Sequence, residues 1–389
     1  MIRAKRVFLV VLDSVGAGEA PDANAFGDVG AHTLRSVFET GALNIPTLTQ
    51  MGIGNIDGLD FLGRVESPSA LVARMCERSA GKDTTIGHWE IAGSISASPM
   101  PTFPNGFPKE VVDRLENAFG RGIICNAPYS GTKVIEDFGE EHLRSGKLIV
   151  YTSADSVLQI AAHTDIVPIE ELYAYCRMAR EIMTGEGLCV GRVIARPFAG
   201  SIGAFTRTAD RRDFSAEPPK GLMPEAIASL GLDSIAVGKI SDIFAGRGFT
   251  ESYPTHGNRE GMEKLDSLIK RDFRGLCFAN LVDFDMLWGH RRDAAAYANG
   301  LCEFDRWLGG FIPKMKADDV LIITADHGCD PAFTATTDHT REYTPCLIYS
   351  GLIEGGNIGT RSTFADIGAT VSALLGVPFV CDGECMINL

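Results

Sequence analysis

The sequence predicts an α/β protein built on a doubly wound, mostly parallel sheet. Three short runs, 7–12, 276–282 and 320–324, are rich in apolar and β-branched residues. Apolar runs of this length are typical of strands that are covered on both faces. Helical patterns follow at 293–311 and 361–375. Strands that alternate with helices favour a sheet with helices packed on both sides.

A smaller domain interrupts this pattern. Two Pro-rich stretches, 98–108 and 217–221, cannot continue a helix or a central strand. The segment between them has strand and helix patterns of its own, at 147–151, 188–194, 109–119 and 170–183. We therefore predict an inserted α+β cap domain at 100–219, and a core domain formed by 1–99 and 220–389. The alternative is that both stretches are surface loops of one large domain.

Composition excludes several classes of protein. The chain carries 36 basic and 50 acidic residues, a net charge of -14, without a Lys/Arg-rich run, so we expect no nucleic-acid or membrane partner. The apolar run 7–12 ends at Asp13, too early for a membrane span or a signal peptide. The ten cysteines are scattered without a CxxC pair, as in proteins that keep reduced thiols. These features predict a cytoplasmic protein.

Each of the three strand runs ends in acidic residues. Asp13 follows the first run, Asp283 and Asp285 follow the second, and Asp326 follows the third. Ligands of parallel α/β sheets bind beyond the carboxyl ends of the strands, so we expect these side chains at one common edge. The glycines within 13–18 offer a dinucleotide site as an alternative, but the third glycine and the spaced acid of that fingerprint are missing.

Histidines accompany two of these carboxylates. Asp326 and His327 are adjacent, and His339 follows within a dozen residues. Asp285 and His290 are five residues apart, and a tight turn at Gly289 would bring them together. Carboxylates with imidazoles suit Zn²⁺ or Mn²⁺. The alternatives are an N-cap role for the aspartates, with solvent-facing histidines.

Six potential ligands thus come together in the predicted core domain. Two metal ions a few ångströms apart would use such a set, at about three protein ligands each. The sequence therefore predicts a dinuclear site. Its candidate ligands are Asp13, Asp285, His290, Asp326, His327 and His339.

The segment 81–90 offers a nucleophile. A threonine hydroxyl becomes reactive when a metal ion lowers its pKa. The spacing of the motif does not show whether Thr84 or Thr85 is the nucleophile. If a helix begins here, its free N–H groups would also hold a phosphate. The simpler interpretation is an Asp83 or Thr84 helix cap.

These motifs together resemble the phosphopentomutases, a prokaryotic-type family of the alkaline phosphatase superfamily. The resemblance covers nearly the whole chain, the inserted domain included. It is carried by the segments LDSVGAG (12–18), KDTTIGHWE (82–90), VDFDMLWGHRRD (282–293), ADHG (325–328) and DHTRE (338–342). It implies an alkaline-phosphatase-like core sheet and two Mn²⁺ ions. It assigns one ion to Asp285, His290 and His339, and the other to Asp13, Asp326 and His327.

The resemblance also implies roles for other residues. Thr84 matches the threonine that the family phosphorylates. Asp155, Arg192 and Arg207 in the inserted domain, and Lys239 in the core, match sugar-phosphate contacts. Arginine can bond two phosphate oxygens at once, while lysine supplies a point charge. The alternative for each is an ordinary solvated side chain. The remaining histidines and the cysteines, Cys329 included, are expected to be structural.

The implied activity is an isomerase reaction of pentose phosphate metabolism and nucleoside catabolism. Ribose 1-phosphate, or 2-deoxyribose 1-phosphate, is interconverted with the 5-phosphate through a phosphothreonine and a 1,5-bisphosphate. A sugar bisphosphate such as glucose 1,6-bisphosphate would prime the enzyme. The alternatives are a phosphatase or a phosphoglycerate-mutase-like enzyme of the same superfamily, or a silent sugar-phosphate-binding protein. The sequence leaves the oligomeric state open.

Overall fold

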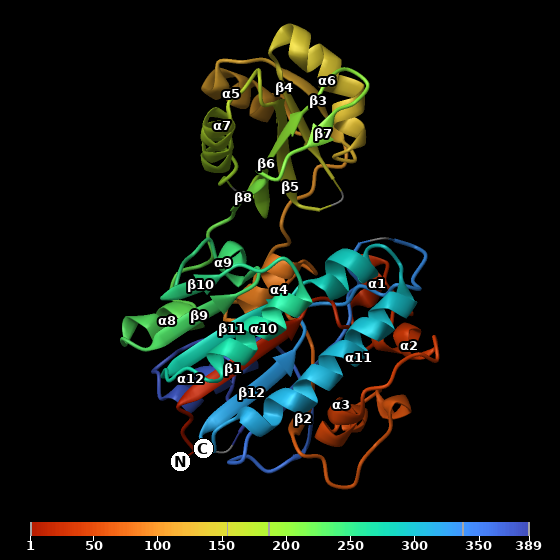
Figure 1. The fold of residues 1–389 in the computed structure, drawn as a ribbon, viewed down its shortest axis with the longest axis vertical. Helices are drawn as coiled ribbons and strands as arrows, with labels where there is room; N and C mark the ends of the chain where they lie inside the picture. Colours follow the sequence, from red (N-terminus) through yellow and green to blue (C-terminus); the bar gives the residue numbers. More distant parts are fainter. Residues whose placement is uncertain (1, 154, 186, 337, 388–389) are drawn as a thin grey trace. The chain divides into compact units, whose positions relative to one another are not determined.

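The computed structural model describes residues 2–153, 155–185, 187–336 and 338–387. The chain divides into two compact units. One, which we call the core unit, consists of Met1–Pro99 and Pro218–Leu389. The other, the inserted unit, consists of Met100–Glu217. Figure 1 shows that each unit has its own sheet and its own helices.

The core unit is built on an eight-stranded sheet. Its strands, in spatial order, are β10 (Glu251–Tyr253), β9 (Asp233–Val237), β11 (Gly275–Leu281), β1 (Arg6–Leu12), β12 (Asp319–Thr324), β13 (Thr344–Tyr349), β2 (Leu71–Met75) and β14 (Gly356–Arg361). The five strands from β10 to β12 are parallel, and β13 is antiparallel to both of its neighbours. The predicted α/β class with a mostly parallel sheet is confirmed.

Helices cover both faces of this sheet (Figure 1). They are α1 (Ala23–Phe26), α2 (Thr33–Phe38), α3 (Pro46–Met51), α4 (Thr84–Ile91), α8 (Met223–Ser229), α9 (Ile240–Ile243), α10 (Asn258–Leu268), α11 (Ala294–Phe311) and α12 (Ala365–Leu375). Short 3-10 turns occupy Ile53–Asn55, Asp60–Leu62 and Ile312–Lys314. Among the described residues, no helix is long and apolar enough to cross a membrane. The predicted helix at 361–375 begins four residues later than expected, because Arg361 still belongs to β14.

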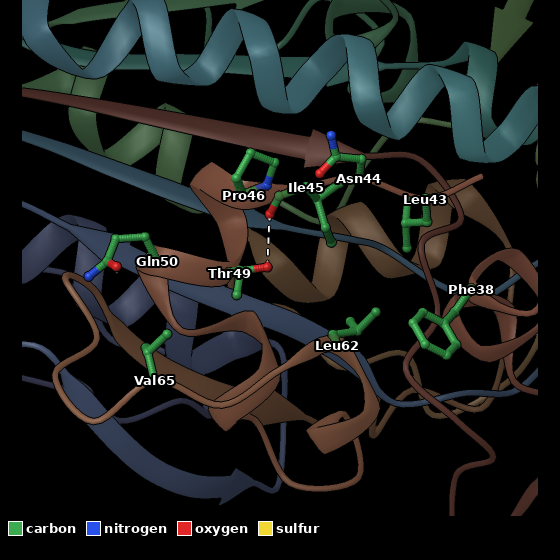
Figure 2. Close-up of a pocket in the computed structure, with 9 residues that line it drawn as sticks. All are labelled: Phe38, Leu43, Asn44, Ile45, Pro46, Thr49, Gln50, Leu62 and Val65. Carbon is green, nitrogen blue, oxygen red and sulfur yellow. Dashed lines mark hydrogen bonds between the residues drawn. The ribbon is translucent and has the colours of Figure 1, made fainter. Parts of the chain in front are cut away.

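A hollow of about 300 Å³ opens near the N-terminus of α3. Figure 2 shows its lining side chains and the bond from the Thr49 hydroxyl to the Ile45 carbonyl. The lining residues are Phe38, Leu43, Asn44, Ile45, Pro46, Thr49, Gln50, Leu62 and Val65. None of these side chains is titratable, so the hollow has no means to perform acid–base or metal chemistry.

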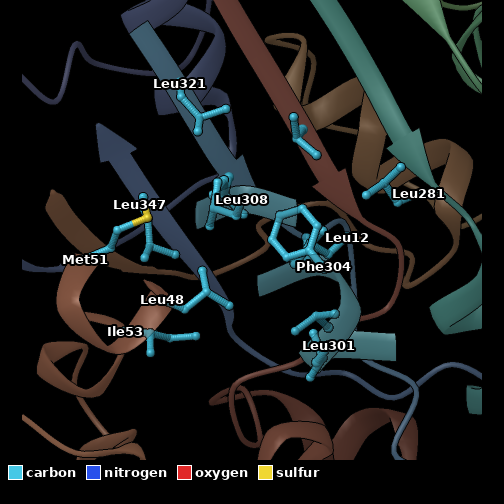
Figure 3. Close-up of a cluster of buried hydrophobic side chains, with 14 of the residues drawn as sticks. Leu12, Leu48, Met51, Ile53, Leu281, Leu301, Phe304, Leu308, Leu321 and Leu347 are labelled. Atoms are coloured by element: carbon cyan, nitrogen blue, oxygen red, sulfur yellow. The ribbon is translucent and has the colours of Figure 1, made fainter. Parts of the chain in front are cut away.

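The main hydrophobic core lies on one face of the core sheet. Phe8, Val10 and Leu12 alternate along β1 and point into it. Leucines from β11, β12 and β13 lie beside them and contact side chains of α3 and α11 (Figure 3). Val7, Leu9 and Val11 point to the opposite face and are also fully buried. Burial on both faces explains why this strand is a continuous apolar run.

The inserted unit has a six-stranded sheet with three helices. The strands are β3 (Ile123–Pro128), β4 (Leu148–Thr152), β5 (Val157–His163), β6 (Arg192–Ala199), β7 (Thr206–Arg207) and β8 (Arg212–Ser215). The helices are α5 (Lys109–Phe119), α6 (Lys133–Ser145) and α7 (Ile169–Ile182). The strand predicted at 188–194 begins at Arg192 instead. Residues 188–190 form a turn, in which the N–H of Val190 bonds to the carbonyl of Leu188.

Candidate metal centre

The carboxyl ends of β1, β11 and β12 carry the acidic residues of the core unit. Asp13 directly follows β1, and Asp326 lies two residues beyond the end of β12. Asp285 lies four residues beyond the end of β11. Because β1 is parallel to both neighbours, the three carboxylates lie at the same edge of the sheet. Each is at least nine-tenths buried.

One group of ligand atoms forms around His327. Its Nε2 atom is 3.4 Å from Asp13 Oδ1 and 3.3 Å from Asp326 Oδ2. The ligand atoms of these three residues lie within 4.8 Å of one another, as a single metal ion requires.

A second group contains Asp285, His290 and His339. The two carboxylate oxygens of Asp285 are 3.4 Å from His290 Nε2 and 3.3 Å from His339 Nε2. The two Nε2 atoms are 3.2 Å apart. The rings of His327 and His339 stack with centroids 3.8 Å apart, so the two groups adjoin.

A π-helical turn, Phe284–Gly289, joins Asp285 to His290. In this turn the N–H of His290 bonds to the carbonyl of Asp285, five residues earlier. Residues five apart therefore face the same side, and no tight turn at Gly289 is involved, contrary to the sequence-based expectation. Gly289 has a different role, which is to leave room for Cys329. The Cβ of any other residue at this position would lie only 2.9 Å from Cys329 Sγ. Single π turns of this kind occur frequently at functional sites.

The orientation of the imidazoles fits metal binding. His327 Nδ1 is 3.0 Å from the Gly328 carbonyl oxygen, and His339 Nδ1 is 3.0 Å from that of Lys82. His290 Nδ1 faces the Cys329 sulfur at 4.0 Å. A proton on Nδ1 that bonds to a carbonyl leaves Nε2 with its lone pair, which is the usual arrangement for a metal-bound histidine. In each of the three rings, Nε2 is the atom that faces the carboxylates.

Buried carboxylates dominate the electrostatics of this centre. Asp13 Oδ1, Asp285 Oδ1 and Asp326 Oδ2 have no hydrogen-bond partner among the described residues, although all three atoms are buried. Burial raises the pKa of Asp326, but the adjacent His327 and His88 lower it further, to about 2. Burial lowers the pKa of His290, yet its bond to Asp285 raises it to about 12. Unpaired buried carboxylates next to imidazoles are a suitable donor set for divalent cations.

Thr84 is the threonine that contacts this centre. It is the first residue of α4, and its hydroxyl oxygen is 3.1 Å from His327 Nε2. The neighbouring Thr85 is equally buried. Asp83 caps the helix, and its carboxylate accepts the N–H groups of Thr85 and Ile86. The Asp83 carboxylate therefore occupies these two N–H groups at the start of α4.

A buried arginine fixes the loop before Thr84. Arg341 is 2% exposed, and its guanidinium bonds to the carbonyls of Glu77 and Gly81 at 2.9 and 2.5 Å. It also pairs with the carboxylates of Glu77 and Asp22. Since Arg341 lies two residues after His339, it ties a ligand-bearing segment to the loop that carries Thr84. Arg341 is part of the motif DHTRE (338–342), but nothing in that motif predicts this contact.

Two polar contacts around the centre also went unpredicted. The Asn280 side chain donates to Asp13 Oδ2 at 3.0 Å from within β11. His88 lies with Nδ1 2.8 Å from the Thr84 carbonyl oxygen and 3.1 Å from Asp326 Oδ2. An asparagine near the carboxyl end of an otherwise apolar strand was the signal available for Asn280.

The structure spreads the predicted substrate contacts over both units. Lys239 lies two residues beyond β9, at the same edge of the core sheet as the metal ligands. In the inserted unit, Arg192 pairs with Asp155 at 3.5 Å and with Asp213 at 3.6 Å. Arg207 lines a pocket together with Arg196 and Arg211, and Arg211 shares Asp213 with Arg192. Lys239 thus belongs to the core unit, and the other three residues belong to the inserted unit.

Comparison with known proteins agrees with a metal centre. The chain matches the metalloenzyme superfamily over residues 5–379. A solved structure of a Pyrococcus horikoshii protein has a TM-score of 0.50 and 13% identity, and the match covers 97% of this chain and 98% of that one. At this identity the likeness concerns the fold alone. It supports the α/β fold that the sequence predicted.

Curated relatives are far more similar in sequence. The phosphopentomutase of Lachnoclostridium phytofermentans is 54% identical over 386 residues, which are 99% of this chain and 98% of the relative. The phosphopentomutase of Clostridium novyi is 50% identical over 385 residues, or 98% of each chain. With half of its positions identical over nearly its full length, the chain belongs to the phosphopentomutase family, the isomerases of the metalloenzyme superfamily that the sequence motifs resembled.

Proposed function

We propose that the enzyme interconverts ribose 1-phosphate, or 2-deoxyribose 1-phosphate, with the corresponding 5-phosphate by way of phosphorylated Thr84. The observation that carries this proposal is the 3.1 Å separation between the Thr84 hydroxyl and His327 Nε2, at the edge of six converging ligands. A hydroxyl in this position is the acceptor that a two-metal phosphotransferase needs. Thr85 has no comparable contact among the described residues.

Two Mn²⁺ ions are the proposed cofactors. Asp13, Asp326 and His327 would hold one ion, and Asp285, His290 and His339 the other. When bound, the pair would neutralise charge on a transferring phosphoryl group and hold the attacking and leaving oxygens in line. The orphaned carboxylate oxygens of Asp13, Asp285 and Asp326 support this assignment.

The reaction moves a phosphoryl group twice. In the first half, the bond between Thr84 Oγ1 and phosphorus breaks, while a free sugar hydroxyl loses its proton and bonds to phosphorus. The product is a 1,5-bisphosphate and an unmodified threonine. After the bisphosphate turns round, its other phosphate returns to Thr84, and the monophosphate isomer leaves. A sugar bisphosphate such as glucose 1,6-bisphosphate would restore any threonine that water has dephosphorylated.

Other residues of the chain would bind the sugar phosphate. Arg192 and Arg207 carry guanidinium groups that can bond two phosphate oxygens each. Lys239 offers a point charge at the edge of the core sheet. The Asp155 carboxylate would accept a hydrogen bond from a ribose hydroxyl. We propose that Arg207→Ala raises KM for ribose 5-phosphate without changing the bound metal content, and an unchanged KM would remove Arg207 from the substrate site.

A ³¹P NMR time course tests the proposed reaction. The purified enzyme would be given ribose 1-phosphate, Mn²⁺ and a trace of glucose 1,6-bisphosphate. Ribose 5-phosphate with little free phosphate is the expected product. Free phosphate as the main product would identify a phosphatase instead. No conversion with either pentose would favour the silent binding protein or another substrate.

Thr84→Ala tests the nucleophile, with Thr85→Ala as the matched control. Thr84→Ala should abolish turnover and phosphoprotein formation while the bound metal stays close to the wild-type amount. Thr85→Ala should keep most of the activity, because its hydroxyl has no contact with the ligand cluster. Full activity of Thr84→Ala would contradict the proposed mechanism.

A further inference from the structure

Glu342 is a buried carboxylate to which the proposed function gives no role. It is 1% exposed and lies three residues after His339. Its hydrogen-bond donors are hydroxyls and backbone N–H groups, and none is a charged side chain among the described residues. Burial raises the pKa of Glu342 to about 7. A carboxylate that is buried without a cation costs free energy, so its position calls for an explanation.

One oxygen of this carboxylate holds the loop that follows β1. Glu342 Oε2 accepts the N–H of Gly18 at 3.1 Å and the N–H of Thr33 at 2.9 Å. The loop passes directly against the carboxylate, because a Cβ on Gly16 would overlap it. This loop begins at Asp13, so Glu342 fixes the chain just beyond a candidate metal ligand.

The other oxygen acts on the loop that follows β12, through two hydroxyls. Glu342 Oε1 accepts from the Thr33 hydroxyl at 2.7 Å and from the Thr340 hydroxyl at 2.6 Å. Each hydroxyl in turn accepts one backbone N–H at 3.2 Å, Thr33 from Cys329 and Thr340 from Asp330. A hydroxyl that donates to a carboxylate presents its lone pairs in the remaining directions. Glu342 therefore sets the direction in which both hydroxyls accept.

Three ligand-bearing segments thus meet at Glu342. The loop after β12 carries Asp326 and His327, and a Cβ on Gly328 would also overlap the carboxylate. Glu342 itself ends the segment that carries His339. Four of the six candidate ligands lie on these segments, and they are Asp13, Asp326, His327 and His339.

We infer that Glu342 is a positioning residue, which holds these three segments so that their ligands match the geometry of a bound metal ion. Removal of groups that orient metal ligands typically lowers metal affinity or activity by about 10–100-fold. The assignment of the four ligands rests on the proposed function. The hydrogen-bond network that joins their segments does not.

Glu342→Ala tests this role in the full-length protein. The substitution leaves the N–H groups of Gly18 and Thr33 without their acceptor. Mn²⁺ would be titrated into the metal-free protein at pH 8, and the free ion would be measured by its EPR signal. We expect the affinity for Mn²⁺ to fall about 10–100-fold. Isomerase activity should fall at low Mn²⁺ and recover in large part at high Mn²⁺, while KM for ribose 1-phosphate stays near the wild-type value.

Glu342→Gln is the conservative variant that should rescue binding. Its amide oxygen can accept the two backbone N–H groups, and its NH₂ group can donate to the two hydroxyls, which accept as well as donate. The network would keep its connections without the charge, so we expect an affinity for Mn²⁺ within about threefold of the wild type. A loss as large as in Glu342→Ala would show that the charge matters and not the positioning, and would overturn the inference.

Asp305→Ala is the matched control for the loss of a buried carboxylate. Asp305 is 2% exposed and accepts the N–H groups of Thr47 and Leu48 at 3.1 and 2.7 Å. Both of these residues belong to α3, which carries none of the candidate ligands. This variant should lose stability and still bind Mn²⁺ like the wild type at a temperature where both are folded. An equal loss of Mn²⁺ affinity in Asp305→Ala and Glu342→Ala would reduce the effect to general destabilisation and overturn the inference.

Thr340→Val tests one arm of the network with a smaller change to the fold. It keeps the shape of the side chain but removes the hydroxyl between Glu342 Oε1 and the N–H of Asp330. We expect the affinity for Mn²⁺ to fall about threefold to tenfold, as for the loss of one or two hydrogen bonds. Wild-type affinity in Thr340→Val, or in folded Glu342→Ala, would overturn the inference.

The isomerase assay separates this inference from the proposed function. If the wild type binds Mn²⁺ but does not convert ribose 1-phosphate, the proposed reaction fails, and weaker Mn²⁺ binding in Glu342→Ala would still support the positioning role. If the wild type is an active isomerase and Glu342→Ala binds Mn²⁺ equally well, the reaction stands and the inference is wrong. Absence of Mn²⁺ binding to the wild type would overturn both the metal assignment and the inference.

Discussion

The strands β1 and β12 carry buried charges at both ends, and the two ends differ. At the amino end, Arg6 and Asp319 lie opposite each other and form two bonds of 2.7 and 2.5 Å. The remaining donors of Arg6 bond to the carbonyls of Ile269 and Arg271. At the carboxyl end, Asp13 and Asp326 each keep a buried oxygen that accepts no hydrogen bond among the described residues and faces only imidazole nitrogens, at 3.1 to 3.4 Å.

This difference separates a structural ion pair from a binding centre. Both ends bury charge in the same sheet, so burial alone does not distinguish them. A fully paired charge has no capacity left for a ligand. Unpaired carboxylates are destabilising until a cation arrives, and such local cost is common where proteins bind or catalyse.

The largest effect is expected at the carboxyl end. Asp326→Asn should lower isomerase activity on the order of a thousandfold, because it removes a charged ligand from the centre that stabilises the transferring phosphoryl group. Metal analysis of the dialysed, Mn²⁺-loaded protein should show reduced metal content. The exposed Asp60→Asn serves as the control. Normal metal content in Asp326→Asn would contradict the ligand assignment.

At the amino end, Asp319→Asn should cost stability instead of activity. Removing one partner leaves Arg6 buried with an uncompensated charge, which typically costs about 3–5 kcal/mol. Urea unfolding would measure the loss, and kcat of the folded fraction should stay near the wild-type value. A variant of normal stability and low activity would show that the two ends are not independent.

Metal binding should stabilise the wild-type fold. At a free Mn²⁺ concentration of 100 times Kd, mass action adds about 2.7 kcal/mol to the free energy of unfolding. A thermal melt with and without Mn²⁺ would show a higher Tm in its presence. The same melt on Asp326→Asn should show a smaller rise, and an equal rise in both proteins would place the metal elsewhere.

The smallest effect is expected for an ion pair near the surface. Bonds from Arg271 and Tyr253 lower the pKa of Glu251 to about 2. Because its folded pKa lies below the unfolded value, Glu251 stabilises the fold above pH 4.5 and loses this effect as the pH falls towards 2. The pair is about one-third exposed, so Glu251→Gln should cost under about 1 kcal/mol at pH 7.

Urea unfolding at pH 7, 4 and 3 would measure how the difference between wild type and Glu251→Gln shrinks. If the difference in unfolding free energy does not depend on pH, the substitution acts through packing and not through the loss of the carboxylate charge. Together with Asp319→Asn, this variant shows how strongly burial sets the cost of breaking an ion pair.

The sequence by itself determined the fold class and the edge at which the centre forms. Strands covered on both faces must be apolar throughout, so runs such as 7–12 and 320–324 were recognisable, and the polar residue after each run marked its carboxyl end. Asp13 and Asp326 followed from this geometry alone, whereas after the second strand it left Asp283 as an alternative to Asp285. Thr84 and the grouping of the ligands followed only from the family resemblance.

Tertiary structure decided the contacts that have no local signature. The carbonyl of Lys82 that orients His339, and the two carbonyls that hold Arg341, come from a loop more than 250 residues away along the chain. Every residue has a carbonyl, so nothing in the side-chain pattern identifies which one will be used. The π turn that aligns Asp285 with His290 likewise depends on how the chain packs beyond β11.

The same reason explains the pocket in the inserted unit. Arg196 is a partly buried residue of β6, whereas Arg207 and Arg211 are exposed residues at the end of β7 and directly before β8. Only the pairing of β6 with β7 brings these guanidiniums together. Local sequence fixes which groups are available, whereas long-range packing fixes which of them share a site.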